Sequence, residues 1–259
     1  MIKEIIVCLI AGVGAGIGTG FAGMSAASII TPILFTFLGV PVYEAIGIAL
    51  ASDVLASAVS AYTYKKNGNI DIKNAIVMLI AVLSFTILGS YISKDVPNAS
   101  MSMGTTIAVF ILGIKFTISP ERKIKETKVA ETRFKGIIKA IISGAIIGLI
   151  CGFLGAGGGM MMLIVLTSVL GYNLKKAVGT SVFIMAFTAF TGSVSHFMLN
   201  GIHYVSVLVL CIISTLVFAR VAAVIANRSS EKVMGRTVGI TLIILGIVVL
   251  TLNYVVTTV

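Results

Sequence analysis

Charged residues are scarce in this sequence: Asp, Glu, Lys and Arg make up 11% of its 259 residues. A soluble domain carries about 25%. Hydrophobic residues make up 58%, and a soluble globule of this length could not hide so much apolar surface from water. The shortage of charge therefore excludes an ordinary cytosolic enzyme and a disordered chain. It predicts an all-α polytopic membrane protein whose outward-facing side chains are solvated by lipid.

Cysteine and histidine are also rare. The three cysteines, Cys8, Cys151 and Cys211, lie in apolar runs, and no two are spaced like a pair of metal ligands. We expect them to be small buried hydrophobic residues, and we expect neither a disulfide scaffold, nor a metal, nor a cofactor. The two histidines, His196 and His203, flank an expected outer turn and are interpreted as interfacial residues rather than ligands.

Positive charge exceeds negative charge, with 19 Lys and Arg against 9 Asp and Glu. Most of the excess lies between apolar segments, where membrane topology selects it. No basic face is interleaved with aromatic residues in the sequence, so nucleic acid is not an expected partner. The expected surroundings are a lipid bilayer, and the sequence leaves a homo-oligomer open.

Ten apolar segments divide the chain. One long polar stretch interrupts them, the basic sequence from Ser119 to Lys135. We take 119–133 as a cytoplasmic linker between a first transmembrane repeat, 1–118, and a second, 134–259. The segments cover residues 4–23, 25–38, 45–64, 70–92, 102–118, 134–154, 158–170, 177–199, 205–225 and 233–257.

The two halves resemble each other. A shift of 132 residues, without a gap, matches ten residues between positions 12 and 47 with identical residues of the second half. Composition alone would give about three matches. The matched residues include Gly12, Gly16, Gly20 and Gly23, and also Leu34 and Gly39. An internal repeat of this kind is common in membrane transporters.

The charged turns predict how the repeats are oriented. If the linker is cytoplasmic, Lys65-Lys66 and Lys175-Lys176 also lie on the cytoplasmic side. The repeat-equivalent pairs, Phe197-Met198 and Tyr43-Glu44, contain no basic residue. Five segments in each half, an odd number, require the second repeat to be inverted. We therefore expect inverted repeats in the plasma membrane, with both termini outside.

The second segment of each repeat is too short to cross a bilayer. Segments 25–38 and 158–170 are about 20 Å of helix, whereas the hydrocarbon core is about 30 Å thick. We expect each to belong to a broken or re-entrant hairpin whose Gly-rich turn stops near the midplane. The glycines before each turn form a GxxxGxxxG face, which predicts close helix packing: Gly12, Gly16 and Gly20, and Gly144, Gly148 and Gly152.

The turns before the two short segments form the candidate binding site. The start of a helix exposes backbone N–H donors and carries about half a positive charge, so two such ends at the midplane would bind an anion. The alternative is a tightly packed turn in which the serines only cap the helix. The candidate residues are Gly23, Met24, Ser25 and Ser28, and Gly155, Gly157, Gly158 and Gly159.

These motifs resemble the TauE/SafE sulfite exporter family. The resemblance rests on Gly152-Phe-Leu-Gly-Ala-Gly-Gly-Gly159 and Ala177-Val-Gly-Thr-Ser181, with a degenerate first copy at Gly20-Phe-Ala-Gly-Met-Ser25. It covers nearly the whole chain and implies transport, often outward, of a small inorganic or organosulfur anion such as sulfite, thiosulfate or a sulfonate. We add Thr180 and Ser181 to the candidate site as hydroxyl donors. Because Ile48-Ala49 stands at the equivalent positions, this contact should be one-sided.

Two charged residues within the apolar segments stand apart. Asp53 lies near mid-depth of its segment, where a buried acid is costly and often functional. It is a candidate for proton or cation coupling, or else a neutral acid bonded to Ser52, Ser57 or a neighbouring helix. Arg220 lies about five residues from the inner end of its segment and either snorkels to the interface or makes a secondary contact to the anion.

Two motifs suggest other classes of protein. Gly18-Thr-Gly-Phe-Ala-Gly23 has the GxGxxG spacing of a dinucleotide site, but a Rossmann unit needs a soluble parallel sheet. Gly23-Met-Ser-Ala26, with His196 as a base, approaches an intramembrane serine hydrolase but lacks the final glycine. A membrane scaffold or assembly subunit is the other alternative. The favoured interpretation is a membrane transporter for a small oxyanion, and not an enzyme.

Overall fold

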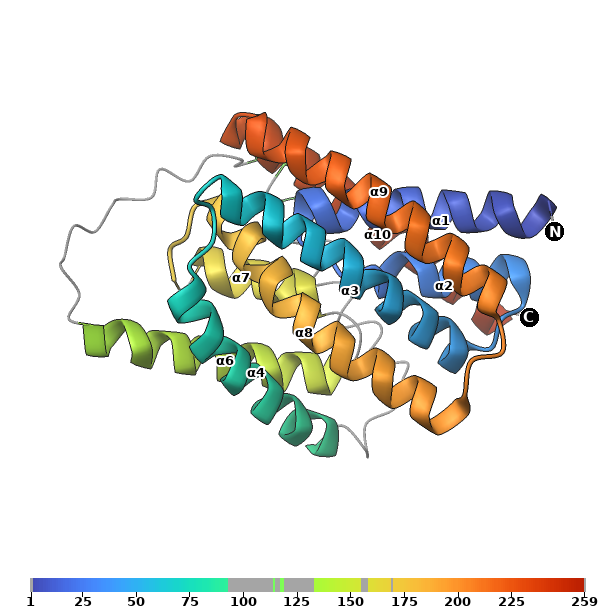
Figure 1. The fold of residues 1–259 in the computed structure, drawn as a ribbon, viewed down its shortest axis with the longest axis horizontal. Helices are drawn as coiled ribbons and strands as arrows, with labels where there is room; N and C mark the ends of the chain where they lie inside the picture. Colours follow the sequence, from blue (N-terminus) through green and yellow to red (C-terminus); the bar gives the residue numbers. More distant parts are fainter. Residues whose placement is uncertain are drawn as a thin grey trace.

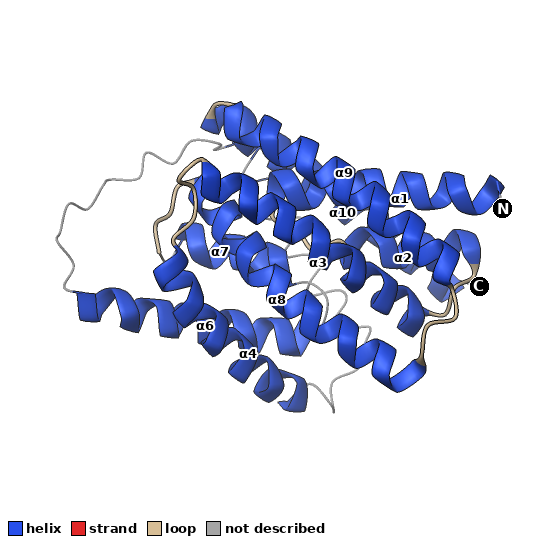
Figure 2. Cartoon of the chain, in the orientation of Figure 1, coloured by secondary structure: helices blue, strands red, loops and turns tan. Residues whose placement is uncertain are grey.

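The computed structural model describes residues 2–92, 114, 117–118, 133–154, 158–168 and 170–258. Within these ranges every regular element is a helix, which confirms the all-α prediction (Figure 2). The segment predicted at 102–118 and the linker at 119–133 lie almost wholly outside the described residues. The helices are α1 (Ile2–Ala22), α2 (Ala27–Leu38), α3 (Val42–Lys66), α4 (Ile72–Ile92), α6 (Arg133–Leu154), α7 (Gly158–Ser168), α8 (Leu174–Asn200), α9 (Val205–Arg228) and α10 (Glu231–Thr258).

The helices differ in whether they can cross a bilayer. Among the described residues, four are long and apolar enough to do so: Ile2–Ala22, Val42–Lys66, Leu174–Met198 and Val205–Arg228. The predicted short second segments are confirmed, since α2 has 12 residues and α7 has 11. At about 1.5 Å per residue neither can span the hydrocarbon core.

The surface of α9 shows how the bundle meets lipid. Small or weakly polar residues face the protein interior, and a stripe of β-branched apolar residues faces outward at a spacing of four. This arrangement reverses that of a helix in water, where the exposed stripe is polar. The exposed residues are Val209, Ile213, Val217, Val221 and Ile225, and the buried ones include Cys211, Thr215, Ala219 and Ala222.

Two central helices, α3 and α8, pack against each other in opposite directions (Figure 1). A Cβ placed on Gly47, near the start of α3, would lie 3.2 Å from His196 near the end of α8. A Cβ on Gly179, near the start of α8, would lie 2.8 Å from the Cβ of Tyr64 near the end of α3. The two helices are therefore antiparallel along most of their length.

The predicted packing glycines form two seams beside this central pair. A Cβ on Gly16 of α1 would lie 2.7 Å from backbone atoms of Thr215 and Ala219, so α1 packs backbone to backbone along α9. A Cβ on Gly144 of α6 would lie 2.7 Å from the Met78 carbonyl oxygen of α4. Any larger residue would push these helices apart, which confirms the packing role inferred from the spacing.

The helices repeat with the same shift of 132 residues that relates the two halves of the sequence. α3 begins at Val42 and α8 at Leu174. The turns that follow the short helices α2 and α7 contain Gly39 and Gly171, both in the left-handed conformation with φ of +66° and +65°. The backbone N–H of Val40 donates to the Leu34 oxygen at 3.3 Å, and that of Tyr172 donates to the Leu166 oxygen at 3.0 Å. The same turn therefore occurs twice.

The basic turns gather at one end of the bundle, here called the basic end. Lys175 at the start of α8 donates to the Asn227 carbonyl near the end of α9 at 2.9 Å. Asn69, in the turn after Lys65-Lys66, donates to the Asn227 side chain at 2.8 Å. The opposite end carries Glu44 and His203, and the start of α1 and the end of α10 lie toward it (Figure 1).

Candidate functional site

The first Gly-rich turn is a break between α1 and α2. The chain leaves α1 through Gly23, whose φ of +60° a side chain would disfavour. The break is held by polar contacts from two sides: the Tyr64 hydroxyl donates to the Gly20 carbonyl, and the Thr19 hydroxyl donates to the Met24 carbonyl, both at 2.9 Å. These bonds satisfy one carbonyl in the last turn of α1 and one in the break, which would otherwise be left unpaired inside the protein.

Ser25 and Asp53 meet at this break. The Ser25 hydroxyl donates to Asp53 Oδ2 at 2.8 Å and accepts the backbone N–H of Ala27, the first residue of α2, at 3.3 Å. The Ser57 hydroxyl donates to Asp53 Oδ1 at 2.9 Å, and Asp53 is only 1% exposed. Of the hydrogen-bond partners predicted for Asp53, Ser57 and a residue of a neighbouring segment, Ser25, bond to it. Ser52 donates instead to the Ile48 carbonyl of its own helix.

The start of α7 lies directly against the first break. A Cβ placed on Gly159 would stand 2.8 Å from the Gly23 oxygen, 2.9 Å from the Ser25 nitrogen and 2.6 Å from the Met185 sulfur. Only a residue without a side chain permits this approach. The two short helices therefore begin beside each other.

Thr180 and Ser181 face different neighbours. A Cβ on Gly23 would run into the Ser181 hydroxyl, which itself donates to the Val178 carbonyl at 2.9 Å. The Thr180 hydroxyl instead accepts the backbone N–H of Asp71 at 3.4 Å, toward the basic end. Both side chains are fully buried. The structure thus brings Ser181 to the central break and turns Thr180 away from it.

The remaining candidates are distributed as follows. Met24 is buried in the break, and Ser28 is half-buried in the first turn of α2. Gly158 begins α7, whereas Gly155 and Gly157 lie outside the described residues. Arg220 is exposed on α9 and is not among the side chains that contact the break.

The chemistry of this arrangement is that of a neutral polar centre beside one acid. Two helix starts, one serine hydroxyl at each side and glycine backbone form a set of neutral donors around a buried acid. Neutral donors hold an oxyanion without a permanent opposing charge, so the anion can leave again. The Asp53 carboxyl adds a group whose protonation state changes the charge of the centre by one unit.

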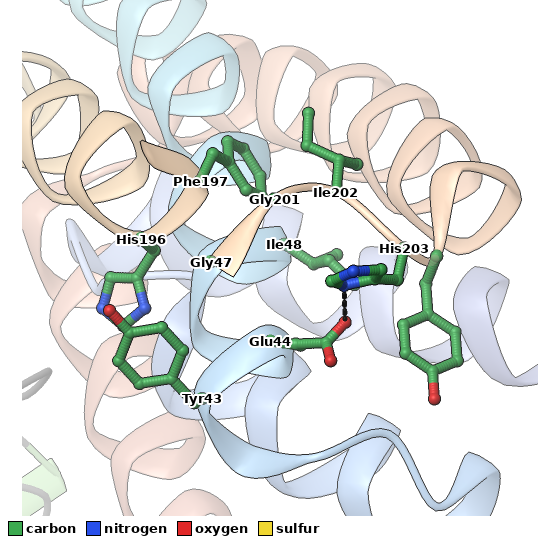
Figure 3. A pocket seen from close by; sticks show the side chains of 10 residues that line it. Tyr43, Glu44, Gly47, Ile48, His196, Phe197, Gly201, Ile202 and His203 are labelled. Carbon is green, nitrogen blue, oxygen red and sulfur yellow. Dashed lines mark hydrogen bonds and ion pairs between the residues drawn. The ribbon is translucent and has the colours of Figure 1, made fainter. Parts of the chain in front are cut away.

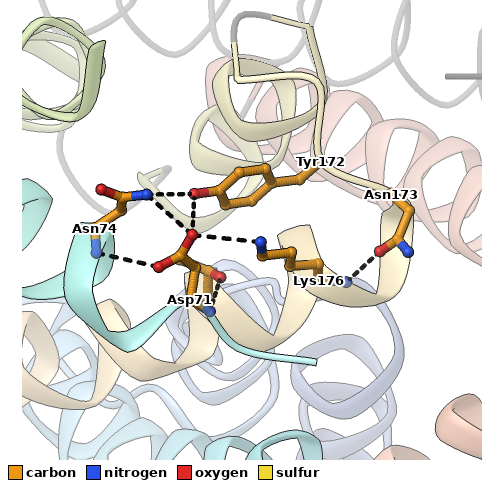
Figure 4. A network of polar contacts seen from close by, with 6 residues as sticks. Asp71, Asn74, Tyr172, Asn173 and Lys176 are labelled. Atoms are coloured by element: carbon orange, nitrogen blue, oxygen red, sulfur yellow. Dashed lines mark hydrogen bonds and ion pairs between the residues drawn. The ribbon is translucent and has the colours of Figure 1, made fainter. Parts of the chain in front are cut away.

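A second polar cluster, which the sequence analysis missed, joins the two halves at the basic end (Figure 4). Asp71, in the turn between α3 and α4, accepts the Tyr172 hydroxyl at 2.9 Å and lies 3.3 Å from the Lys176 ammonium. Asn74 donates to both carboxylate oxygens of Asp71, at 3.2 Å through its backbone and at 2.9 Å through its side chain. Lys176 also lies 4.5 Å from the centre of the Tyr172 ring.

Electrostatics hold this cluster in one protonation state. Burial pushes the pKa of Asp71 upward, but the hydrogen bonds from Asn74 and Tyr172 and the charge of Lys176 outweigh it and leave the pKa of Asp71 below its ordinary value. Burial also raises the pKa of Tyr172 well above its ordinary value, so this hydroxyl remains a donor.

A pocket opens at the opposite end, between the start of α3 and the turn from α8 to α9 (Figure 3). His203 Nδ1 lies 3.3 Å from Glu44 Oε2, and the ring of His196 packs 4.2 Å, centroid to centroid, from that of Tyr43. The sequence predicted both histidines as interfacial, and both lie at this end. Pairing of one of them with Glu44 was not foreseen.

Broken helices that meet at a buried polar centre are typical of secondary transporters. A family model described as "Sulfite exporter TauE/SafE" matches residues 8–249, so the chain belongs to this family. It is a multi-pass membrane transporter and not an enzyme. In keeping with this, Ser25 bonds to Asp53, whereas His196, the base of the hydrolase alternative, lies against Tyr43.

Curated relatives carry matching names. "Probable membrane transporter protein YdhB" of Bacillus subtilis (strain 168) is 25% identical over 237 residues, covering 91% of this chain and 96% of the relative. "Probable membrane transporter protein YunE" of the same organism is 25% identical over 263 residues, covering 93% and 94%. A "Probable membrane transporter protein" of Haemophilus influenzae is 30% identical over 212 residues, covering 78% and 76%.

Proposed function

We propose that the protein exports a small sulfur-containing oxyanion, such as sulfite, thiosulfate or a sulfonate, across the plasma membrane. The anion binds between the turn 23–28 and the turn 155–160, with Ser181 as a nearby hydroxyl donor. The observation that carries the proposal is the contact of Gly159 with Gly23 and Ser25, which puts the starts of α7 and α2 side by side. The family description names sulfite as the cargo of this group of proteins.

The two repeats, 1–118 and 134–259, are inverted in the membrane and joined by a cytoplasmic linker at 119–133. The antiparallel packing of the equivalent helices α3 and α8 supports the inversion. Asn227 bonds both to Lys175 and to Asn69, in the turn after Lys65-Lys66. This grouping of two basic turns supports a cytoplasmic basic end, because basic residues are enriched in cytoplasmic loops. The membrane potential then favours outward movement of net negative charge by about 2.3 kcal/mol per charge per 100 mV, and a proton carried with the anion offsets one of its charges.

Asp53 couples anion binding to a proton. An ionised Asp53 would repel an anion at the neighbouring turn, because like charges interact strongly at short range inside a protein. It would also engage the Ser25 hydrogen, which lies 2.8 Å from the carboxylate. A protonated Asp53 removes the charge and donates to Ser25, whose own hydrogen then points to the anion. The anion and the proton therefore bind together.

The experiment that tests the function is flux of isotopically labelled sulfite in proteoliposomes. Flux should exceed that of empty liposomes, and unlabelled thiosulfate or a sulfonate should compete with it if the site takes the wider class. Ser25→Ala should reduce the flux, whereas Ser84→Ala, at an exposed position where the hydroxyl bonds only to its own helix, should not. No flux of sulfite and no flux of the other sulfur oxyanions would refute the proposal and favour a scaffold.

A further inference from the structure

Two contacts between an acidic and a basic side chain stand at the two ends of the central α3–α8 pair. At the basic end, Lys176 lies 3.3 Å from Asp71. At the opposite end, His203 lies 3.3 Å from Glu44. The shift of 132 residues that relates the two halves carries Glu44 onto Lys176 and Asp71 onto His203. The two contacts therefore join equivalent positions of the two halves. The acidic residue of each contact stands where the other contact has its basic residue.

Each pair ties together the same two elements of the fold. Lys176 lies in the first turn of α8, and Asp71 lies in the turn that follows α3 (Figure 4). Glu44 lies in the first turn of α3, and His203 lies in the turn that follows α8 (Figure 3). Each contact thus closes one end of the central pair across the boundary between the two halves.

We propose that these contacts are two latches, an inner one at Asp71–Lys176 and an outer one at Glu44–His203, which open in turn during transport. The latches rest on the proposed central site, since a compartment between the ends is what they would close. With both latches formed, as here, Ser25 and Asp53 are buried, with 8% and 1% of their surface exposed. Opening either pair would give access to the centre from that side only.

The two latches differ in strength. Asp71 of the inner latch accepts hydrogen bonds from Asn74 and Tyr172 besides its contact with Lys176, whose side chain is 37% exposed. In the outer latch the His203 side chain is 62% exposed, and exposed ion pairs contribute little because water and salt screen them. The outer end should therefore open more readily than the inner end.

A matched pair of reporter cysteines tests the latches. Ala61 and Ser193 occupy equivalent positions of α3 and α8, and their exposed fractions are 7% and 5%. Ala61 lies toward the basic end and Ser193 toward the opposite end. Each is changed to cysteine in a chain whose native cysteines, Cys8, Cys151 and Cys211, are replaced by alanine. The rate of maleimide labelling in detergent is measured, since in detergent the reagent reaches both ends.

Breaking one latch should expose one reporter. Asp71→Asn should raise the labelling rate at Ala61→Cys by about fivefold or more, the low end of typical coupling between sites, and leave Ser193→Cys unchanged. Glu44→Gln should raise the rate at Ser193→Cys alone, and by a smaller factor because the outer latch is weaker. Lys176→Gln is the second inner variant, because it breaks the ion pair but keeps the Tyr172 and Asn74 bonds to Asp71.

Because the two latches occupy equivalent positions, the residues of the inner latch can be placed at the outer one. Glu44→Lys combined with His203→Asp places the inner partners at the outer positions, and this double variant should slow labelling of Ser193→Cys again relative to Glu44→Lys alone. The proposal is overturned if the inner variants leave Ala61→Cys unchanged, or if they raise both reporters equally, as general loosening would. Because the assay uses no substrate, a failure here is distinct from a failure to transport sulfite.

Discussion

The hydroxyl of Ser25 lies 2.8 Å from Oδ2 of Asp53, and this bond joins the break between α1 and α2 to the middle of α3. The same hydroxyl accepts the N–H of Ala27, the first residue of α2. One oxygen atom thus links a helix start, which favours an anion, to an acid, which disfavours one. The balance between them depends on whether Asp53 carries a proton.

The first prediction follows from this balance. Asp53→Asn should remove the dependence of anion flux on a proton gradient, because the amide is neutral at every pH. Flux is measured in proteoliposomes with and without a pH gradient. Unchanged flux with unchanged gradient dependence would assign Asp53 a structural role only.

The second prediction separates the Ser25 bond from ordinary serine burial. Ser25→Ala should destabilise the protein by about 1–3 kcal/mol, because a buried carboxylate oxygen loses its donor. Ser52→Ala is the control, since this buried serine donates only to the Ile48 carbonyl of its own helix, and it should cost clearly less. Thermal unfolding of both variants in detergent makes the comparison. Equal losses of stability in the two variants would indicate that the Ser25–Asp53 bond contributes no more than the Ser52 bond.

The third prediction concerns the contact between the two breaks. Gly159→Ala should abolish anion binding, because its Cβ would meet backbone atoms of Gly23 and Ser25 at 2.8 and 2.9 Å. Gly144→Ala meets backbone equally closely, 2.7 Å from the Met78 oxygen, but in the α4–α6 seam. Both should lower the melting temperature, and overpacking of this kind costs about 1–3 kcal/mol. Calorimetric sulfite affinity should fall only for Gly159→Ala; normal affinity in that variant would move the site elsewhere.

The fourth prediction is a pH dependence at the basic end. The pKa of Asp71 is lower in the folded protein than its ordinary value, so its contribution to stability is present at neutral pH and is lost as the pH falls through the lowered pKa. The melting temperature of the wild type should therefore exceed that of Asp71→Asn by a constant margin from pH 7 to about pH 5, and the margin should shrink below the ordinary Asp value of about 3.9. A margin that shrinks between pH 7 and pH 5 would contradict the assignment.

The fifth prediction is topological. Cysteine introduced at Asn67, after Lys65-Lys66, should react only with reagent on the cytoplasmic side, and cysteine at Asn200 only with external reagent. Impermeant maleimide applied to intact cells and to inverted vesicles makes the distinction. Labelling of both positions from one side would exclude inverted repeats.

Much of the fold could be predicted from the sequence because it depends on local composition. Lipid solvates apolar surface, so a long apolar run predicts a helix. The run 205–225 is an example, since α9 extends only three residues beyond it. The shortness of α2 and α7 and the positions of the packing glycines could likewise be predicted from the local sequence. The meeting of Gly159 with Gly23 could be anticipated only because the internal repeat implies a pair of equivalent turns.

The rest depended on packing between residues far apart in the chain. Consecutive residues on a helix point about 100° apart, so Thr180 and Ser181 cannot face the same neighbour, and only the position of the Asp71 turn decides which one reaches the centre. The bond from Ser25 to Asp53 joins residues 28 positions apart, and that from Tyr172 to Asp71 joins residues 101 apart. The sequence by itself determined which segments become helices, because each is stabilised by its own apolar residues. Only the tertiary structure decided which polar side chains meet, because that depends on how all the helices pack around α3 and α8.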